Sequence, residues 1–410
     1  MSEAKLLPVA EAQKRIIDAM PILPIEQISV ADGFGRTLAE PIVSRRDQPP
    51  TDVSAMDGYA VRAEDVATMP VELEIVGYAP AGHSFRGEIG PHEAVRIFTG
   101  APIPAGANTI VLQENTEKFG ERVRVTSGDA PLGKFVRSAG LDFSQGDPLL
   151  PAGRTLTARD IGLAAAMNVP WLKVRRKPRI SILSTGDEIV MPGDPVEQDQ
   201  IVSSNALSLA AIVKAIGGDP IDLGIAPDRE NELTALAAGA IGSDILLTTG
   251  GASVGDHDLV KDALEDIGLK IDFWKIAMRP GKPLIFGNIS GTFLIGLPGN
   301  PVSSTVCAIM FLAPAIRRML GIEPVLPERL RAKIAHDLPE NDEREDYMRG
   351  MLLRDKDGDL KVSAHKIQDS SMYATMARSD VLIVRPPYAP PCTRGVAVEF
   401  IQLAGSHFNI

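Results

Sequence analysis

Cysteine and histidine are scarce in this chain of 410 residues, and their scarcity limits the chemistry available to it. The cysteines are Cys307 and Cys392, with no CxxC pair, and the six histidines form no dense cluster. A disulfide framework and a cysteine-based zinc site are therefore excluded. This usage is typical of a protein in a reducing compartment, and we expect a cytoplasmic location.

Long apolar runs and several nucleotide-binding motifs are also missing. Nowhere do ~18 uncharged apolar residues run together, and the N-terminal stretch carries early acidic residues, so we expect neither a membrane span nor an export signal. Neither G-x-G-x-x-G nor GxxxxGK[ST] occurs, which argues against a dinucleotide fold and a P-loop NTPase. The 53 acidic and 42 basic side chains leave a net charge of −11, which repels nucleic acid and anionic membranes. Any anionic ligand must be held by local donors.

The pattern of residue types changes twice in the first half of the chain. Apolar spacing predicts a helix over residues 9–20, which Pro21 ends. Residues 48–140 hold short apolar pieces separated by Gly and Pro, a pattern that indicates a small β-rich domain. A second helix follows, with Thr157 as N-cap and Asp160 completing a capping box. The β-rich block therefore reads as an insertion within a helical domain.

The second half alternates between apolar strands and amphipathic helices from residue 178 onward. The strands "RISILS", "PIDLGIA", "DILLTTG" and "TFLIGL" are separated by predicted helices over 205–216, 228–240 and 257–267. Continuously apolar strands of this kind predict a parallel sheet covered on both faces. A helix from Pro301 to Leu320, which Pro314 should kink, comes next. The last ~80 residues alternate like a small β domain or barrel.

The loops that leave the carboxyl ends of these strands are the expected ligand site. The first loop, "STGDEI", spans Ser184, Thr185, Gly186, Asp187 and Glu188, and by itself it equally fits a capped turn. The third loop, "LPGNPVSS", spans Pro298, Gly299, Asn300 and Pro301 and reaches Ser303. Helix initiation alone would explain its residues.

The second loop, "TTGGASVGDHD", predicts a phosphate site. Gly250, Gly251 and Gly255 allow the backbone to turn several N–H groups toward an anion at the start of a helix. The same residues match G-x-S-x-G, the turn that exposes a nucleophilic serine, here Ser253. A triad would then need a histidine from the C-terminal part of the chain, where His336, His365 and His407 occur.

Charged residues near these loops suggest ligands for a cation and an oxyanion. The carboxylates beside the two predicted anion cradles favour a hard divalent cation such as Mg²⁺ that bridges phosphate oxygens; they are Glu188, Asp228, Asp256 and Asp258. In "FWKIAMRPGKPLIFG", Lys275, Arg279 and Lys282 flank a Pro-Gly turn beside apolar residues. They form either an oxyanion pocket or a solvated basic face.

Taken together, the motifs resemble one known family. "SAMDGYAV", "RIFTGAPIPAGAN", "STGDEI", "TTGGASVGD", "RPGKP" and "GLPGNPVS", in this order, are similar to the molybdopterin molybdenumtransferase family, which includes bacterial MoeA and the E domain of gephyrin. The resemblance covers nearly the whole chain.

The resemblance implies a multidomain α/β and β protein with an elongated four-domain subunit. The expected parts are a discontinuous helical domain (5–47 plus 141–175), an inserted β domain (48–140), a three-layer α/β/α, MogA-like molybdopterin-binding domain (176–324) and a C-terminal β-barrel-like domain (325–410). It also implies a homodimer whose cleft combines the α/β domain of one subunit with the inserted β domain of the other. Transient contact with a molybdopterin adenylyltransferase and with molybdoenzyme chaperones is expected too.

The activity implied by the resemblance is Mg²⁺-dependent hydrolysis of adenylated molybdopterin, with insertion of molybdate into the dithiolene and release of AMP. A non-catalytic molybdopterin-binding scaffold and a serine hydrolase using Ser253 are the alternatives.

The resemblance also assigns roles to individual residues. Catalytic roles fall on Asp57 and Glu188. Substrate contacts fall on the three loops and on Thr99, Gly100, Asp142, Asp228, Ser253, Asp258 and Lys275. Molybdate contacts fall on Arg279, Lys282, Pro283, Ser303, Arg349 and either Ser370 or Ser371. Arg279 stands where the family motif has lysine, which keeps the charge but alters the geometry offered to molybdate or tungstate.

Overall fold

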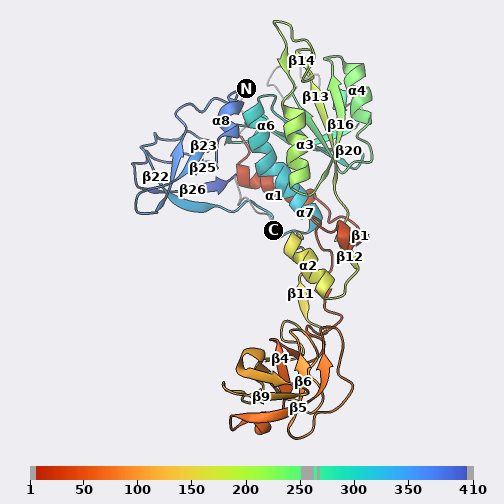
Figure 1. Cartoon of the computed structure of the whole chain (residues 1–410). Coiled ribbons are helices and arrows are strands. Elements are labelled where there is room, and N and C mark those ends of the chain that lie inside the picture. The colour runs from red at the N-terminus through yellow and green to blue at the C-terminus, as the bar shows by residue number, and fades with distance from the viewer. Residues whose placement is uncertain (1–5, 251–262, 266–267, 404–410) are drawn as a thin grey trace.

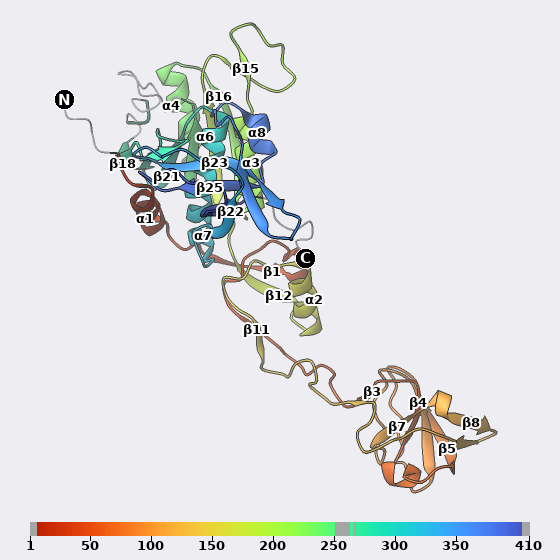
Figure 2. The same cartoon turned by 90° about the vertical axis from the view of Figure 1, so that its left-hand side faces the viewer.

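The computed structural model describes residues 6–250, 263–265 and 268–403. The subunit is elongated: a small β domain lies at one end of a narrow neck, and the α/β and C-terminal domains lie together at the other (Figures 1 and 2). The chain runs out along the neck and back again, so the β domain is an insertion, as the short apolar pieces separated by Gly and Pro predicted.

The α/β domain is built on one mixed six-stranded sheet. Its order is β16 (Asp219–Ala226), β13 (Arg179–Thr185), β17 (Ile245–Thr249), β21 (Thr292–Leu297), β20 (Ile285–Ile289) and β18 (Leu269–Trp274). The first four strands are parallel, but β20 pairs antiparallel with both β21 and β18. The prediction of a parallel sheet is thus correct for the four predicted strands and misses an antiparallel edge, because a tight turn at 290–291 joins β20 directly to β21.

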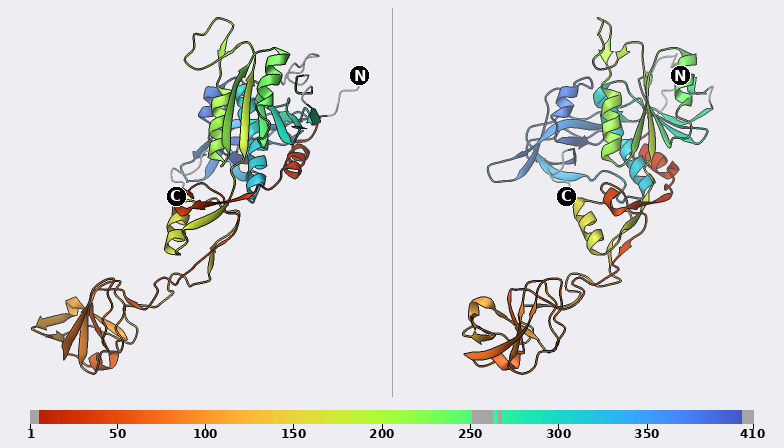
Figure 3. Two further views of the ribbon diagram at one scale, coloured as in Figure 1. Left: turned by 90° about the vertical axis from the view of Figure 1, so that its right-hand side faces the viewer. Right: turned by 45° about the vertical axis from the view of Figure 1, so that its right-hand side comes forward.

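Helices cover both faces of this sheet, as expected for a three-layer domain (Figure 3). One face packs against α3 (Asn205–Ala215), α1 (Val9–Ala19) and the long helical segment at 301–320. The other face packs against α4 (Glu230–Ala238) and the buried residues Ala263 and Leu264. Ile16 of helix α1 and Met20, which directly follows the helix, belong to the first core, so this part of segment 5–47 packs with the α/β domain.

The helical segment from Pro301 to Leu320 is continuous but not uniform. Helix α6 (Pro301–Cys307) passes through a π-helical stretch (Ala308–Leu312) into α7 (Ala313–Leu320). Pro314 lacks an N–H and crowds the preceding turn, and the structure accommodates it by widening the helix rather than by ending it. The segment is long and apolar enough to span a membrane, but 78% of its most apolar window is buried inside the protein, as in a core helix.

The C-terminal domain is a closed five-stranded barrel. It consists of β22 (Leu330–Ile334), β23 (Glu345–Arg354), β24 (Leu360–Ala364), β25 (Val381–Arg385) and β26 (Ala397–Gln402), with α8 (Tyr373–Ala377) before β25. The β23–β25 pairing closes it. Strand β19 (Met278–Arg279), which comes from the α/β domain, pairs with β23. Barrel residues such as Tyr347 and Leu382 share a core with the α/β domain.

The neck joins segments far apart in sequence. β1 (Ile25–Ser29) pairs with β12 (Trp171–Arg175), β2 (Ile42–Val43) with β11 (Pro148–Leu150), and β3 (Val53–Ser54) with β10 (Val136–Arg137). Helix α2 (Ala158–Ala166) packs here, and its predicted capping box between Thr157 and Asp160 is confirmed.

The inserted β domain has a six-stranded sheet with a small core on each face. Its order is β7 (Thr109–Leu112), β4 (Gly58–Val61), β6 (Glu93–Ile97), β5 (Val71–Ala79), β9 (Arg122–Val125) and β8 (Thr116–Phe119).

Candidate functional site

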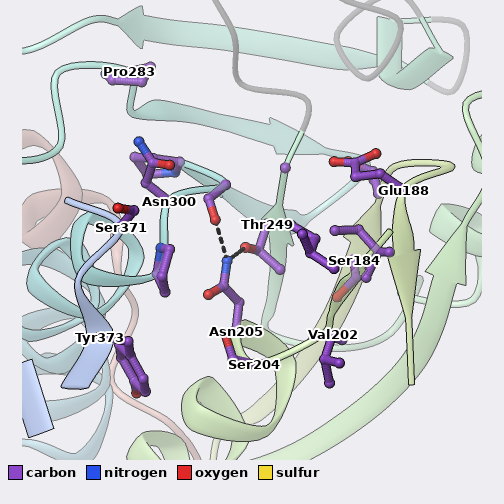
Figure 4. A pocket seen from close by; sticks show the side chains of 18 residues that line it. Ser184, Glu188, Val202, Ser204, Asn205, Thr249, Pro283, Asn300, Ser371 and Tyr373 are labelled. Atoms are coloured by element: carbon purple, nitrogen blue, oxygen red, sulfur yellow. Dashed lines mark hydrogen bonds between the residues drawn. The ribbon is translucent and has the colours of Figure 1, made fainter. Parts of the chain in front are cut away.

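A cavity of about 670 Å³ opens at the carboxyl ends of the parallel strands, where the α/β domain meets the C-terminal barrel. The loops after β13, β17 and β21 all reach it, which confirms the prediction that they share one sheet edge. Ser371 and Tyr373 close it from the barrel side. Figure 4 shows Glu188 on one wall and Asn300 with Ser371 on the opposite wall.

Two hydroxyl groups on the cavity wall lack partners. Ser184 Oγ and Thr185 Oγ1 are buried, and neither has a hydrogen-bond partner among the described residues. A buried hydroxyl without a partner costs free energy unless a ligand or water satisfies it. These two residues therefore mark the cavity as a place for a polar ligand.

Gly250 allows the loop after β17 to approach the loop after β13. Its φ is 98°, and a Cβ at this position would lie 2.4 Å from the carbonyl oxygen of Thr185. Only glycine fits such a conformation and such a contact. The glycine in this loop thus brings two cavity walls together.

Asn205 connects helix α3, which forms a further wall of the cavity, to these loops. From the first turn of α3 its amide nitrogen donates to Thr249 Oγ1 and to the carbonyl oxygen of Gly299, both at 2.7 Å (Figure 4). Asn300 in turn donates to Ser370 Oγ of the barrel at 3.0 Å. The cavity is therefore held by polar contacts from three loops and a helix.

Glu188 is the carboxylate that lines the cavity, and its side chain is exposed. Asp228 follows the neighbouring strand β16, where its backbone N–H donates to Asp187 Oδ1 at 3.0 Å, so it belongs to the same sheet edge. Within the described residues, no three His, Cys, Asp or Glu side chains come close enough to form a metal cluster. The donor set still fits Mg²⁺, which one or two carboxylates hold together with waters and phosphate oxygens.

The basic residues that were predicted to bind an oxyanion differ in how many hydrogen bonds and ion pairs they already make with other residues. Arg279 donates to Asp342 at 2.9 Å, to Asn341 at 2.9 Å and to Asp346 at 2.6 Å. The hydrogen bond to Asp346 raises the pKa of Arg279. Its guanidinium therefore joins strand β19 to the barrel.

The side chains of Lys282 and Arg349 make fewer hydrogen bonds within the described residues than that of Arg279 does. Lys282 is exposed and has no ion pair among the described residues. Arg349 is buried, its Nε lacks a described partner, and its Nη2 donates to the carbonyl oxygen of Asp369. Burial lowers the pKa of Arg349, although the guanidinium stays charged.

The remaining residues predicted around the oxyanion site are spread along the barrel junction. Pro283 and Ser371 line the cavity, and Ser303 is buried in the first turn of α6. Ser371 Oγ donates to Asp369 at 2.6 Å. Lys275 is half-buried, with its ammonium 4.3 Å from the centre of the Trp274 ring.

Four predicted residues lie outside both the α/β domain and the barrel. Asp57 and Thr99 are on the inserted β domain, where Asp57 Oδ1 accepts hydrogen bonds from Thr99 N at 2.8 Å and Thr99 Oγ1 at 2.9 Å. These bonds lower the pKa of Asp57. Gly100 and Asp142 line a second cavity, of about 540 Å³, where the neck enters the β domain. The neck separates the inserted β domain from the α/β domain that carries the first cavity (Figures 1 and 2).

Several predicted residues cannot be placed. Gly251, Ser253, Asp256 and Asp258 fall outside the described residues, so the serine-nucleophile and metal-ligand predictions for them stay predictions.

Sequence reasoning also missed part of the cavity wall. The missed residues are Ile201, Val202, Ser203, Ser204, Asn205, Thr249 and Tyr373. For the polar residues of this set, the sequence signal was the run Ser-Ser-Asn at the start of a predicted helix. For Tyr373 the sequence held no signal, because its position at the cavity depends on how the barrel packs against the α/β domain.

Three family profiles match consecutive parts of the chain. The MoeA N-terminal region (domains I and II) matches residues 7–168, a probable molybdopterin binding domain matches 181–318, and the MoeA C-terminal region (domain IV) matches 331–403.

Curated relatives and a solved structure agree with these profiles. A molybdopterin molybdenumtransferase of Nostoc sp. is 42% identical over 78% of this chain and 75% of its own length. One of Haemophilus influenzae is 33% identical over 92% and 94%. A molybdopterin biosynthesis MoeA protein from Pyrococcus horikoshii superposes with a TM-score of 0.83 at 30% identity, covering 98% of this chain and all of that one. The chain therefore belongs to the molybdopterin molybdenumtransferase (MoeA) family.

Proposed function

We propose that the protein catalyses the metal-insertion step of molybdenum cofactor biosynthesis. In this reaction it binds adenylated molybdopterin and molybdate, cleaves the phosphoanhydride bond, releases AMP and yields the molybdenum-bound pterin. The observation that carries the proposal is the cavity at the strand ends, with its unpartnered buried hydroxyls and glycine-built loop, in a chain of this family.

The residues of the cavity are suited to hold phosphate and pterin groups. Ser184 and Thr185 offer buried hydroxyls without a partner among the described residues, and Gly250, which also lines the cavity, lets the backbone pass close to Thr185. Phosphoryl chemistry needs mainly positioning and charge stabilisation, with little covalent help from the protein. The attacking oxygen comes from water or from molybdate.

Magnesium is part of the proposal. Glu188 would hold the ion from the cavity wall, and Asp228 would support it from the same sheet edge. When bound, Mg²⁺ would neutralise charge on the phosphate oxygens.

For molybdate, we propose that Lys282 and Arg349 supply the positive charge and that Ser371 offers a hydroxyl from the barrel. Arg279 contributes by holding its loop against the barrel, because its guanidinium already serves Asp342 and Asp346. A bound oxyanion would also give the buried Nε of Arg349 a partner.

We further propose that the active form is a homodimer in which the inserted β domain of one subunit faces the cavity of the other. Support comes from the neck, which separates the inserted β domain that carries Asp57 from the α/β domain that carries the cavity (Figure 2). It comes also from large apolar side chains exposed along the neck, which include Ile25 (46%), Phe34 (59%) and Trp171 (56%). Exposed apolar surface of this kind is often covered by a partner.

The test is one incubation of purified protein with adenylated molybdopterin, Mg²⁺ and molybdate. We expect AMP and a molybdenum-bound pterin to form together, and both to depend on molybdate. Glu188→Gln should remove most turnover without unfolding the protein.

The same incubation separates the alternatives. Tight pterin binding without AMP release would contradict the enzyme and support a scaffold. Labelling of Ser253 by a fluorophosphonate, with loss of activity in Ser253→Ala, would support a serine hydrolase.

A further inference from the structure

The inserted β domain carries an aromatic surface that none of the assigned roles uses. Strand pairing sets Tyr59 of β4 beside Arg96 of β6, and Arg96 beside Tyr78 of β5. Residues directly opposite each other on neighbouring strands point to the same face, and Phe98 follows Arg96 at the alternate position. The side chains of Arg96, Phe98 and Tyr78 thus form one surface, which we call the aromatic patch.

The patch is ordered by contacts within the domain. The Arg96 guanidinium lies 4.6 Å from the centre of the Phe98 ring and 5.3 Å from that of Tyr59. It also donates to the carbonyl oxygen of Gly58 at 2.7 Å and to Gln113 Oε1 at 2.5 Å. A guanidinium held this way fixes the ring beneath it.

The outer part of the patch is open. Tyr78 is 59% exposed, and its ring lies 5.1 Å from that of Phe98 at an interplanar angle of 59°. Phe98 is half-buried. A large aromatic side chain this exposed, beside a second aromatic ring, offers a flat apolar face that water covers at a cost.

The patch adjoins the residue to which the family resemblance gives a catalytic role. Asp57 precedes Gly58, whose carbonyl oxygen holds Arg96, and Thr99, which donates twice to Asp57, follows Phe98. A ligand held at Asp57 and Thr99 would therefore lie next to the chain segment that carries Phe98, whose ring contacts Tyr78.

We propose that the aromatic patch binds the purine base of a nucleotide by stacking, so that the adenine of the adenylated substrate rests on the inserted β domain. This inference rests on the proposed function for the identity of the base. Aromatic rings and arginine planes stack on bases through surfaces that every base presents. The remainder of the nucleotide then extends from the patch toward Asp57.

The proposal is tested by direct binding, which requires no turnover. Full-length protein is titrated calorimetrically with AMP and, separately, with ribose 5-phosphate, which lacks the base. Phe98→Ala and Tyr78→Ala should each weaken AMP binding by about tenfold and leave ribose 5-phosphate binding unchanged. Phe98→Tyr, which keeps a ring, should bind AMP like the unmodified protein.

Phe119→Ala is the matched control. Phe119 is 43% exposed and lies 5.8 Å from the Arg124 guanidinium, but it belongs to β8 at the opposite edge of the same sheet. Its removal should not change AMP binding.

Several results would overturn the proposal. They are the absence of AMP binding by the unmodified protein at millimolar concentration, equal losses for AMP and ribose 5-phosphate, or an equal loss in Phe119→Ala. A change in dimer fraction on ultracentrifugation with AMP affinity intact would instead identify the patch as a contact with a second copy. AMP binding that depends on Phe98 in a protein without insertion activity would contradict only the proposed function.

Discussion

Gly250 follows the last residue of strand β17 and lines the cavity, and its backbone conformation explains why glycine stands at this position. Two structural features require glycine at this position: a φ of 98° and a close approach to the carbonyl oxygen of Thr185. The unusual φ could be predicted from the sequence, because paired glycines indicate unusual turns. The contact with Thr185 could not be predicted, since Thr185 is 65 residues away in the chain and only the β13–β17 pairing brings it close.

We expect Gly250→Ala to lower the free energy of unfolding by about 2–4 kcal/mol and to abolish AMP release. A left-handed alanine costs about 1–2 kcal/mol, and the clash with a backbone atom adds to that cost. Urea unfolding and the turnover assay measure the two effects.

Gly193→Ala is the control for the backbone term alone. Its φ is 100°, but nothing lies within 4 Å of the added Cβ. It should cost only the conformational part and keep full turnover. Equal effects of the two substitutions would show that the contact with Thr185 has no role.

Arg279 illustrates a motif residue whose side-chain partners could not be predicted from the sequence. The turn "RPGKP" is recognisable from sequence, and a cation beside an apolar run suggests an oxyanion pocket. The carboxylates that engage this guanidinium, Asp342 and Asp346, belong to a barrel more than 60 residues later. No residue near Arg279 in the sequence indicates that these two carboxylates will contact it.

At the scale of single elements, the sequence patterns that predicted structure best were those with a stereochemical cause. The capping box of α2 could be predicted because its hydrogen bonds connect residues three apart. The extent of the helix at 301–320 and a kink caused by Pro314 were predicted, but the π-helical stretch Ala308–Leu312 was not, because how a helix accommodates an interior proline depends on its packing. Strands β18 and β20 were missed because these antiparallel strands do not follow the strand–helix alternation.

Asp160 gives α2 a pH-dependent stability. Burial disfavours its charged form, but hydrogen bonds from Arg154 and Thr157 outweigh this, and the net effect lowers the pKa of Asp160. A depressed folded-state pKa means that the stabilisation is complete above about pH 4, the unfolded value, and is lost as the pH falls through the folded-state pKa. Asp160→Asn should therefore reduce the free energy of unfolding by about 1–2 kcal/mol at pH 7 and by less at pH 3.

Denaturant unfolding at both pH values checks this expectation. Asp18→Asn, which removes an exposed i,i+4 pair with Lys14, should change stability by less than about 0.5 kcal/mol. A pH-independent effect of Asp160→Asn would rule out the charged cap as the cause.

At the scale of the whole molecule, the neck decides how the catalytic candidates can meet. Asp57 directly precedes β4 of the inserted β domain and Glu188 follows β13 of the α/β domain. These two domains lie at opposite ends of the chain's long axis (Figure 1). If Asp57 and Glu188 act on one substrate, they must come from different subunits of the proposed homodimer.

Mixing two inactive variants tests this arrangement. Asp57→Asn and Glu188→Gln should each be inactive alone, but heterodimers formed by co-expression should contain one intact site per dimer. Random pairing should restore about a quarter of the normal turnover per subunit. Activity no higher than that of either variant alone, in samples shown by mass spectrometry to contain heterodimers, would contradict a shared cleft.

The sequence alone determined the features that depend on neighbours along the chain. These are the alternation of strand and helix, the caps, the glycine turns and the loop motifs that reveal the family, all of which follow from local backbone stereochemistry and hydrophobic periodicity. Tertiary structure decided the rest. It brought Tyr373 and Ser371 to the cavity, committed Arg279 to the barrel and set Asp57 at the far end of a neck. Contacts of this kind join residues far apart in sequence, so they depend on how finished elements pack and leave no local pattern to read.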